Sequence, residues 1–194
     1  MEITSAQIKE LRDQTGISVM QCKKALEEAG GDMEKALIIL KQKRKEAADK
    51  KSDRTLGAGT VGVYTHNTSE VAAMVLLASE TDFVSKNEEF VALAREIAMH
   101  VAAQNPKFLS RDEVGEEAVA KAKEVFAEDI KDKPAEMQEK IMEGKLSSYF
   151  KEQILLEQPF IKNPDVTIGE MVNGAVQKFG ENVSIVEFKR LSVK

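Results

Sequence analysis

Apolar residues in the first fifty positions recur at helical spacing, in three short groups that are separated by polar residues and glycines. Thr4 and Ser18 each have a glutamine three residues later, which is the spacing of a capping box at a helix start. Asp32 follows two glycines and is a natural cap for a third helix, while the glycines suit the end of the second. The pattern therefore predicts three amphipathic helices around one small core, in a domain that covers residues 1–50.

The apolar pattern stops after Leu40. The stretch KQKRKEAADKKSDRTLG that follows has more lysines and arginines than acids, and few apolar side chains. Such a composition is typical of a solvated helix end that continues into a linker. We expect the linker to occupy residues 51–57 and a second domain to cover residues 58–194. A surface that binds RNA is the alternative interpretation of the basic residues in 41–54.

The second domain begins with a change of period. Residues 59–66 alternate between apolar and polar positions, and an Asn-Thr-Ser turn signal separates them from an apolar run at 71–79, so we expect a hairpin. Residues 182–193 predict a closing third strand, and helices are expected at 87–104 and 168–179. Helices and strands do not alternate regularly, which favours an α+β fold with a three-stranded antiparallel sheet packed by helices.

Two further capping boxes are predicted in this domain. Ser85 with Glu88 has the spacing that starts a helix, so the residues before Ser85 are expected to be a loop between a strand and that helix. Thr167 with Glu170 predicts the start of a later helix, which Gly180 ends.

A helical insertion is expected at about residues 110–155. Ser110 with Glu113 predicts a polar helix that continues to about Ile130. Two more helical segments are expected after it, one on each side of Gly144.

Composition limits the class of protein. The chain has 194 residues, a net charge of −5 and one cysteine, Cys22, which cannot form an intrachain disulfide and is expected to be buried in its helix. The longest apolar stretch, at 71–78, is much shorter than the roughly 20 residues of a membrane helix, and the chain start lacks a signal peptide's apolar run. We expect a cytoplasmic protein without a membrane segment that binds protein rather than nucleic acid, because its net charge repels phosphate.

Signatures of catalysis are missing from the sequence, which has no P-loop, GxSxG, HExxH, EF-hand loop or GxGxxG. His66 and His100 lack the partners of a metal site, and His100 is expected to be a packed ring. The clustered acids are expected to serve as helix caps and dipole partners; they are Glu80, Asp82, Glu88 and Glu89. The sequence therefore shows no sign of an enzyme, which would have to use scattered acids, and it predicts no metal or cofactor.

Four separated stretches carry a family resemblance. They are LRDQTGISVMQCKKALEEAGGDMEKAL at 11–37, SETDFVSKNEEF at 79–90, AMHVAAQNPKFL at 98–109 and QPFIKNPDVTIGEMV at 158–172. Together they closely resemble elongation factor Ts, the guanine nucleotide exchange factor for elongation factor Tu, over nearly the whole chain. The resemblance implies that the three N-terminal helices form a ubiquitin-associated-like module that docks on elongation factor Tu, and that the chain promotes GDP release.

The resemblance also implies which residues act. The loop that intrudes near the magnesium and phosphate of the partner matches Thr81, Asp82, Phe83 and Val84, and the docking residues match Arg12, Met20 and Lys23. Phe83 would then be exposed in the free protein because its pocket belongs to the partner. The alternative is that the ring packs at the start of the next helix as part of the core.

A homodimer is expected from the sheet. In the last strand Val183 and Ile185 are predicted to point to one face and Val186 and Phe188 to the other, whereas the helices cover one face only. Two such sheets packed about a two-fold axis would bury the second face. The alternative is a monomer whose segment 110–155 folds over that face, with cover from Phe126, Phe150, Leu155 and Leu156.

Two other functions fit the sequence. An adaptor would use the three-helix module to hold a partner without changing the affinity of that partner for any ligand. An RNA-binding factor would use the basic residues in 41–54 instead.

Overall fold

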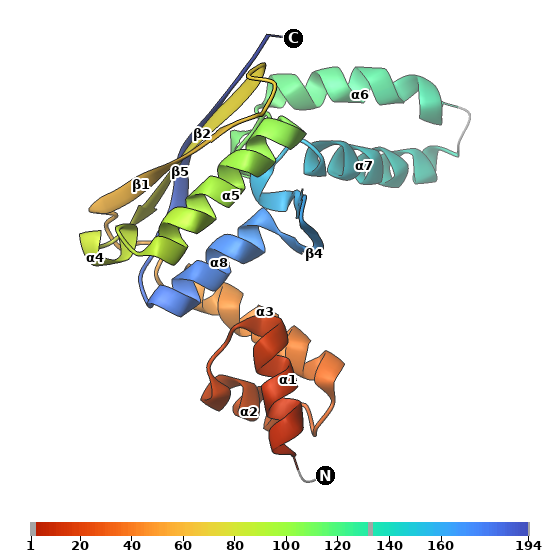
Figure 1. Ribbon diagram of the computed structural model, residues 1–194. Coiled ribbons are helices and arrows are strands. Elements are labelled where there is room, and N and C mark those ends of the chain that lie inside the picture. Colours follow the sequence, from red (N-terminus) through yellow and green to blue (C-terminus); the bar gives the residue numbers. More distant parts are fainter. Residues whose placement is uncertain (1–2, 132–133, 194) are drawn as a thin grey trace.

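The computed structural model describes residues 3–131 and 134–193, and it has the α+β fold that the sequence predicts (Figure 1). The α-helices are α1 (Ser5–Thr15), α2 (Val19–Glu28), α3 (Met33–Asp49), α4 (Asp82–Ser85), α5 (Glu88–Gln104), α6 (Glu116–Ile130), α7 (Ala135–Lys151) and α8 (Ile168–Phe179). The strands are β1 (Ala58–Thr65), β2 (Val71–Ser79), β3 (Pro159–Phe160), β4 (Asn163–Thr167) and β5 (Val183–Ser192). Short 3-10 helices lie at Arg111–Glu113 and Leu155–Glu157.

Helices α1, α2 and α3 enclose a core of their own. Its buried residues are Leu11, Ile17, Cys22, Ala25, Leu26, Ala36 and Leu40. Thr4 forms the predicted capping box, and Asp32 caps α3 by accepting from the Lys35 amide at 3.1 Å. Ser18 also caps its helix, but its hydroxyl rather than its amide donates to the Gln21 side chain, so half of that predicted box is present. The three predicted helices are therefore confirmed.

The main sheet is antiparallel with strand order β1-β2-β5, and helices α5 and α8 cover one face of it (Figure 1). Val75, Leu77 and Ile185 point into the core on that face. At Gly62 the backbones of β1 and α5 touch, because an added Cβ there would lie 2.2 Å from the carbonyl carbon and oxygen of Ala94. Any side chain at this position would push α5 away from the sheet.

A β-bulge in β5 changes the predicted faces of that strand. Leu76 pairs with Glu187 while the next residue, Leu77, pairs with Ile185, so Val186 is an extra residue without a partner on β2. Phe188 therefore lies opposite Val75, on the same face as Ile185, and packs against the main core. The prediction that Phe188 points away from the core was wrong, because strict alternation holds only where the strand has no inserted residue.

The second face of the sheet stays open within the described chain. Its exposed apolar residues are Val61, Val63, Met74, Val186 and Leu191. Helices α6 and α7 project away from the sheet as a hairpin (Figure 1), and Phe150 is buried in a separate cluster between them with Ala122 and Ile154. The alternative in which segment 110–155 covers this face was therefore wrong.

Several helix boundaries differ from the predicted ones. Asn87, not Ser85, caps α5, and Ser85 is buried at the end of α4. Helix α6 begins at Glu116 rather than near Ser110, since a 3-10 turn comes first. Helix α7 continues through Gly144 as one helix, so the predicted break there was wrong.

His100 is fully buried in α5 and joins that helix to the small β3–β4 sheet. The sequence did not predict this second sheet. The Nδ1 of His100 accepts from the Ile161 amide at 3.3 Å, and its Nε2 lies 2.9 Å from Gln158 Oε1. Since Nδ1 accepts, the ring proton is on Nε2 and the imidazole is neutral. Burial lowers the pKa of His100, and the hydrogen bond to Gln158 only partly opposes this effect.

We predict that acid destabilises the protein through His100. Because the folded pKa lies below the unfolded value of about 6.5, the stabilising contribution is complete above that pH and is lost as the pH falls towards the folded pKa. Urea unfolding at pH 7.5 and pH 5.5 should show a lower unfolding free energy at pH 5.5. A His66→Asn variant, which changes an exposed histidine, should keep this difference. A histidine NMR titration with the His100 midpoint above 6.5 would contradict the prediction.

Candidate functional site

The residues matched to the intruding loop form the one-turn helix α4 and its cap, not the irregular loop that the sequence predicted. Thr81 is the N-cap residue, and Phe83 is 82% exposed, the largest exposed fraction among the large hydrophobic side chains that the structure describes. The Phe83 ring therefore does not pack into the core, which rejects the alternative interpretation. Asp82 is exposed beside it and accepts from Lys86 Nζ at 2.7 Å; this hydrogen bond, with the lysine charge, lowers the pKa of Asp82.

The opposite side of α4 is fixed in the core. Val84, next to the exposed ring, is only 3% exposed and belongs to the main hydrophobic cluster. Ser85 is also buried and donates to the Asp82 carbonyl at 3.4 Å. The Ser79 hydroxyl, at the end of β2, donates to the Thr81 carbonyl at 3.0 Å. Adjacent residues therefore have opposite environments, and the helix presents Phe83 outward from a packed base.

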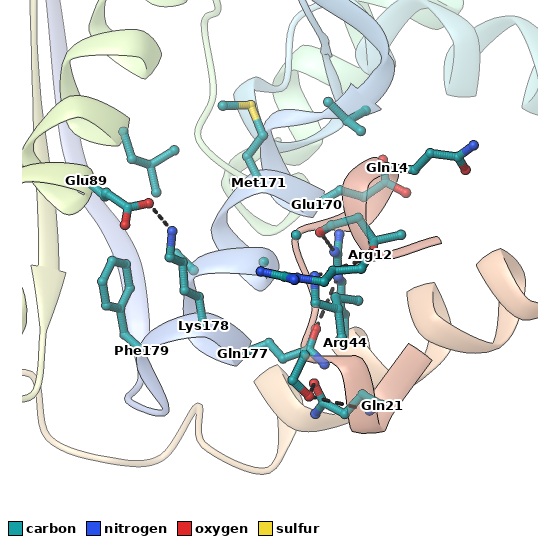
Figure 2. Close-up of a pocket in the computed structure, with 18 residues that line it drawn as sticks. Arg12, Gln14, Gln21, Arg44, Glu89, Glu170, Met171, Gln177, Lys178 and Phe179 are labelled. Atoms are coloured by element: carbon teal, nitrogen blue, oxygen red, sulfur yellow. Dashed lines mark hydrogen bonds and ion pairs between the residues drawn. The ribbon is translucent and has the colours of Figure 1, made fainter. Parts of the chain in front are cut away.

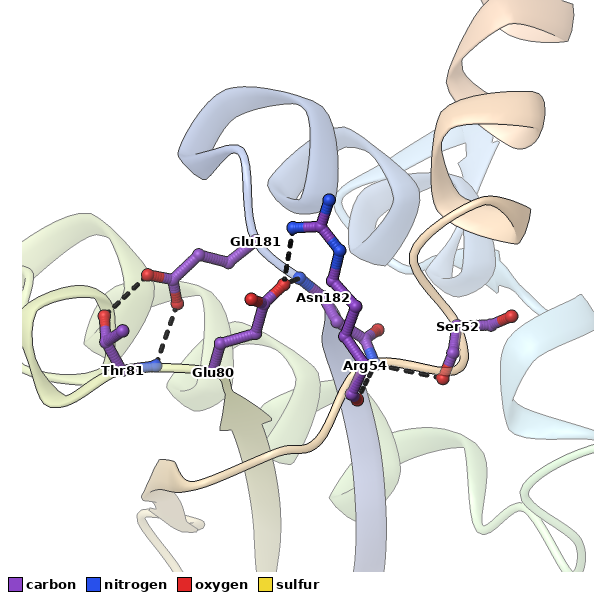
Figure 3. A network of polar contacts seen from close by, with 6 residues as sticks. All are labelled: Ser52, Arg54, Glu80, Thr81, Glu181 and Asn182. Carbon is purple, nitrogen blue, oxygen red and sulfur yellow. Dashed lines mark hydrogen bonds and ion pairs between the residues drawn. The ribbon is translucent and has the colours of Figure 1, made fainter.

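A polar network holds the start of α4 to the turn between α8 and β5 (Figure 3). The Glu181 carboxylate accepts from the Thr81 amide at 3.0 Å and from the Thr81 hydroxyl at 2.6 Å. On the other side of the network, the Glu80 carboxylate, just before α4, accepts from the backbone amide of Asn182 at 2.5 Å. It also accepts from the Arg54 guanidinium at 3.3 Å. The hydrogen bond from Asn182, ahead of the contribution of Arg54, lowers the pKa of Glu80, so Glu80 is ionised at neutral pH.

The same network includes the linker after α3. The side-chain amide of Asn182 is buried and donates to the carbonyls of Ser52 and Arg54, at 3.2 and 3.0 Å. One asparagine, directly before β5, thus holds the linker to the start of that strand (Figure 3).

The predicted docking residues are all exposed, but they do not form one cluster. Met20, which is 65% exposed, and Lys23 lie three residues apart at the start of α2 and share one helix face. Lys23 also makes a long ion pair of 3.8 Å with Glu27. Arg12 lies in the last turn of α1 and lines a cleft between the N-terminal helices and α8 (Figure 2).

This cleft has a volume of about 670 Å³, and Arg44 crosses it (Figure 2). From α3, Arg44 Nη2 donates to the Thr15 carbonyl at 2.5 Å and Nε donates to Gln177 Oε1 of α8 at 3.1 Å. Burial lowers the pKa of Arg44, but the group remains charged, and the nearby Glu170 carboxylate opposes the shift. Lys41 pairs with Glu170 at 3.1 Å. Arg44 therefore connects the N-terminal helices directly with the second core.

The basic residues of α3 are largely used inside the chain. Lys43 pairs with Glu28 at 2.6 Å, and Arg44 and Lys41 make the contacts just described. Arg54 is held by Glu80. Partly neutralised side chains contribute less to a phosphate-binding surface, which weakens the interpretation of this segment as an RNA site.

Sequence reasoning missed Arg44, Glu181 and Asn182. Arg44 looked like one of several solvated cations, and its contacts to residues 29 and 133 positions away have no local spacing signal. Glu181 and Asn182 come directly after the helix-ending Gly180, where the sequence indicated only a turn. Their role depends on the strand pairing that brings residues about 100 positions apart together.

None of the helices in the part of the chain that the structure describes is long and apolar enough to cross a membrane.

Comparison with known proteins gives consistent matches over the chain. The family model described as Elongation factor TS matches residues 21–194. A relative named Elongation factor Ts from Carboxydothermus hydrogenoformans is 46% identical over 193 residues, which cover 98% of this chain and 89% of the relative. Another of that name, from Thermodesulfovibrio yellowstonii, is 45% identical over 194 residues, covering 100% of this chain and 97% of the relative. A third, from Syntrophus aciditrophicus, is 45% identical over 192 residues, with 98% of this chain and 96% of the relative covered.

Proposed function

We propose that this chain, which belongs to the elongation factor Ts family, promotes GDP release from elongation factor Tu by disturbing the magnesium and phosphate site. The family implies nucleotide exchange on elongation factor Tu during translation elongation. The observation that carries the finer proposal is the exposed Phe83 on a helix whose other side is packed. The chain would act by binding, without covalent chemistry or a cofactor, in the cytoplasm.

The proposed mechanism uses the ring of Phe83 as a wedge. Burying a phenyl ring in a partner crevice contributes about 1.5–3 kcal/mol. If the crevice opens only when the contacts to magnesium and phosphate loosen, this energy favours the nucleotide-free state of the partner. Asp82, beside the ring and ionised, would add a negative charge close to the phosphates and disfavour them further. Thr81 and Val84 would hold both side chains in place.

The N-terminal helices would supply the second contact. We place docking on residues 1–50, with Met20 and Lys23 on one helix face and Arg12 near the cleft, and exchange on residues 58–194, joined by the linker 51–57. Separate hydrophobic clusters support this division, and the ubiquitin-associated-like character of the module is part of the same proposal. Two contacts on one chain strengthen each other, because the first raises the effective concentration of the second.

Binding of the factor and of nucleotide must oppose each other. A factor that weakens GDP binding is itself bound less tightly when GDP is present, by the same coupling free energy. An incoming nucleotide therefore displaces the factor from elongation factor Tu. The exchange cycle needs no further energy source.

The direct test is the release of labelled GDP from elongation factor Tu, with and without this chain. An exchange factor accelerates release, whereas an adaptor binds the complex and leaves the release rate unchanged. A salt titration of RNA binding tests the third function, since phosphate contacts make affinity fall steeply with salt.

We predict that Phe83→Ala lowers the rate of GDP release by about tenfold or more at saturating factor, from the lost burial of the ring. The melting temperature should stay close to that of the unchanged chain, because the ring is exposed in the free protein. Val125→Ala, which shortens another exposed apolar residue on α6, is the matched control and should leave release unchanged. A large drop in melting temperature with normal release per folded molecule would contradict the wedge.

We predict that Met20→Ala raises the concentration of factor needed for half-maximal release by about fivefold, from partial loss of apolar burial on docking. The rate at saturation should change little, because Met20 is not on the wedge. Ile38→Ala is the control, since Ile38 is an exposed apolar residue on α3 outside the docking set. Equal effects of the two substitutions would show that the docking face is elsewhere.

We also propose a homodimer formed through the open face of the sheet. Exposed Val63 and Met74 lie opposite each other on β1 and β2, and Val61 and Val186 extend the apolar surface. A two-fold axis would bring this surface against its own copy, which is the geometry of a self-complementary interface. Cys22 is buried in the N-terminal helices, so association would depend on concentration and not on a disulfide between the sheets.

Light scattering on a dilution series is expected to give a mass near twice 21.5 kDa at high concentration, falling on dilution. Val63→Lys, which introduces a charge into the exposed apolar surface of the open face, should give the monomer mass at every concentration. A mass that stays near 21.5 kDa for the unchanged chain at the highest concentration would exclude the dimer.

A further inference from the structure

Helix α4 is too short to hold its own position. It has four residues, and an isolated helical turn is unstable because nucleation costs more than one turn of hydrogen bonds returns. Its N-cap residue, Thr81, also makes no side-chain cap hydrogen bond within the helix. The position of Phe83 must therefore come from contacts with other parts of the chain.

Besides the packing of Val84 and the hydrogen bond from Ser79 to the Thr81 carbonyl, two carboxylates supply such contacts. They form a crossed arrangement, which we call the carboxylate clamp (Figure 3). Its members are the consecutive residues Glu80 and Thr81 on one segment, and Glu181 and Asn182 on the other. The first residue of each pair accepts from the backbone amide of the second residue of the other pair: Glu181 from Thr81 at 3.0 Å, and Glu80 from Asn182 at 2.5 Å. The clamp joins the end of β2 to the start of β5.

The two halves of the clamp have different tasks. Glu80 and Asn182 also bond to Arg54 and to the linker carbonyls, so they connect strands and linker. In the network of Figure 3, both bonds of Glu181 go to Thr81: the Thr81 hydroxyl, which accepts no cap hydrogen bond from α4, donates to Glu181 at 2.6 Å. Glu181 is half-buried and follows the left-handed Gly180, which fixes the direction of its backbone.

We propose that Glu181 is a positioning residue for nucleotide exchange, which holds the first residue of α4 so that the Phe83 ring is presented in its binding orientation. The inference rests on the proposed function of this chain. Without the clamp, part of the free energy from burying the ring would be used to order α4 on the partner. Removing Glu181 would then slow GDP release only when the Phe83 ring is present.

This dependence on the ring separates positioning from a general structural role. A residue that acts through Phe83 shows no further effect once Phe83 is removed, whereas a residue that stabilises the fold acts in both backgrounds. A double-mutant cycle between Glu181→Ala and Phe83→Ala measures this difference. GDP release from elongation factor Tu is the readout, at saturating and at half-saturating factor, together with the melting temperature of each variant.

We expect Glu181→Ala to lower the saturated release rate about fivefold in the unchanged background, the size typical of losing a partly exposed charge-assisted hydrogen bond. In the Phe83→Ala background it should change the rate by less than about twofold. Glu181→Gln, which keeps an acceptor for one of the two bonds, should give an intermediate rate. Thr81→Val removes the hydroxyl bond but keeps the amide bond, and should also be intermediate.

Glu117→Ala is the matched control, because Glu117 is an exposed glutamate on α6 that pairs with Lys121 at 2.6 Å. It should leave the release rate unchanged. If Glu181→Ala lowers the melting temperature strongly, Glu181→Gln or Thr81→Val takes its place in the double-mutant cycle with Phe83→Ala.

An equal loss of rate with and without the ring would overturn the positioning role while leaving the proposed function intact. A normal rate of GDP release with the folded Glu181→Ala variant would also overturn the positioning role. If the unchanged chain does not accelerate GDP release, the proposed function fails, and this inference fails with it.

Discussion

Burial of one face of a three-stranded sheet is the constraint on which the rest of this structure depends. Helix α5 contacts the backbone of β1 at Gly62, and α8 completes the helical layer on the same face of the sheet. The helices leave the opposite face and the strand ends uncovered. The end of β2 is where the chain leaves the covered face. Val84 can therefore stay in the core there while Phe83 faces outward, and the exposed ring is a consequence of where the helical layer stops.

The features that the sequence predicted depend on residues close to one another. The caps at Thr4, Asp32 and Thr167 and the end at Gly180 need partners within three or four positions, and all four are present. The predicted range 87–104 fits α5, but the cap was assigned to Ser85 because Ser85 and Asn87 are both suitable caps. The choice between them follows from packing: Ser85 is buried beside Val84 at the end of α4, which leaves Asn87 to begin the next helix.

The features that it did not predict are non-local. One inserted residue, Val186, reverses the faces of the strand after it, and no residue type at that position signals a bulge. The contacts of Glu181 and Arg44 likewise join segments about 100 and 133 positions apart. For the candidate site, the sequence supplied the identity of Phe83 and Met20 by resemblance. It could not supply helix α4, the carboxylate clamp or the cleft beside Arg12, because those depend on the assembled core.

The two proposed contact sites do not share one continuous apolar core, and they are connected by polar groups and by Ala48 of α3, which packs against the cluster of the sheet domain. The N-terminal helices and the sheet domain each bury their own cluster, and Arg44 joins them through a carbonyl on α1 and an amide on α8. Such hydrogen bonds depend on direction, so they fix an angle between the two parts more sharply than apolar contact of similar size would. Asn182 adds a second fixed point on the linker. Docking through the N-terminal helices would then bring Phe83 to the partner at a defined distance. The entropy cost of fixing the two parts of the chain relative to each other would already have been met in the free protein.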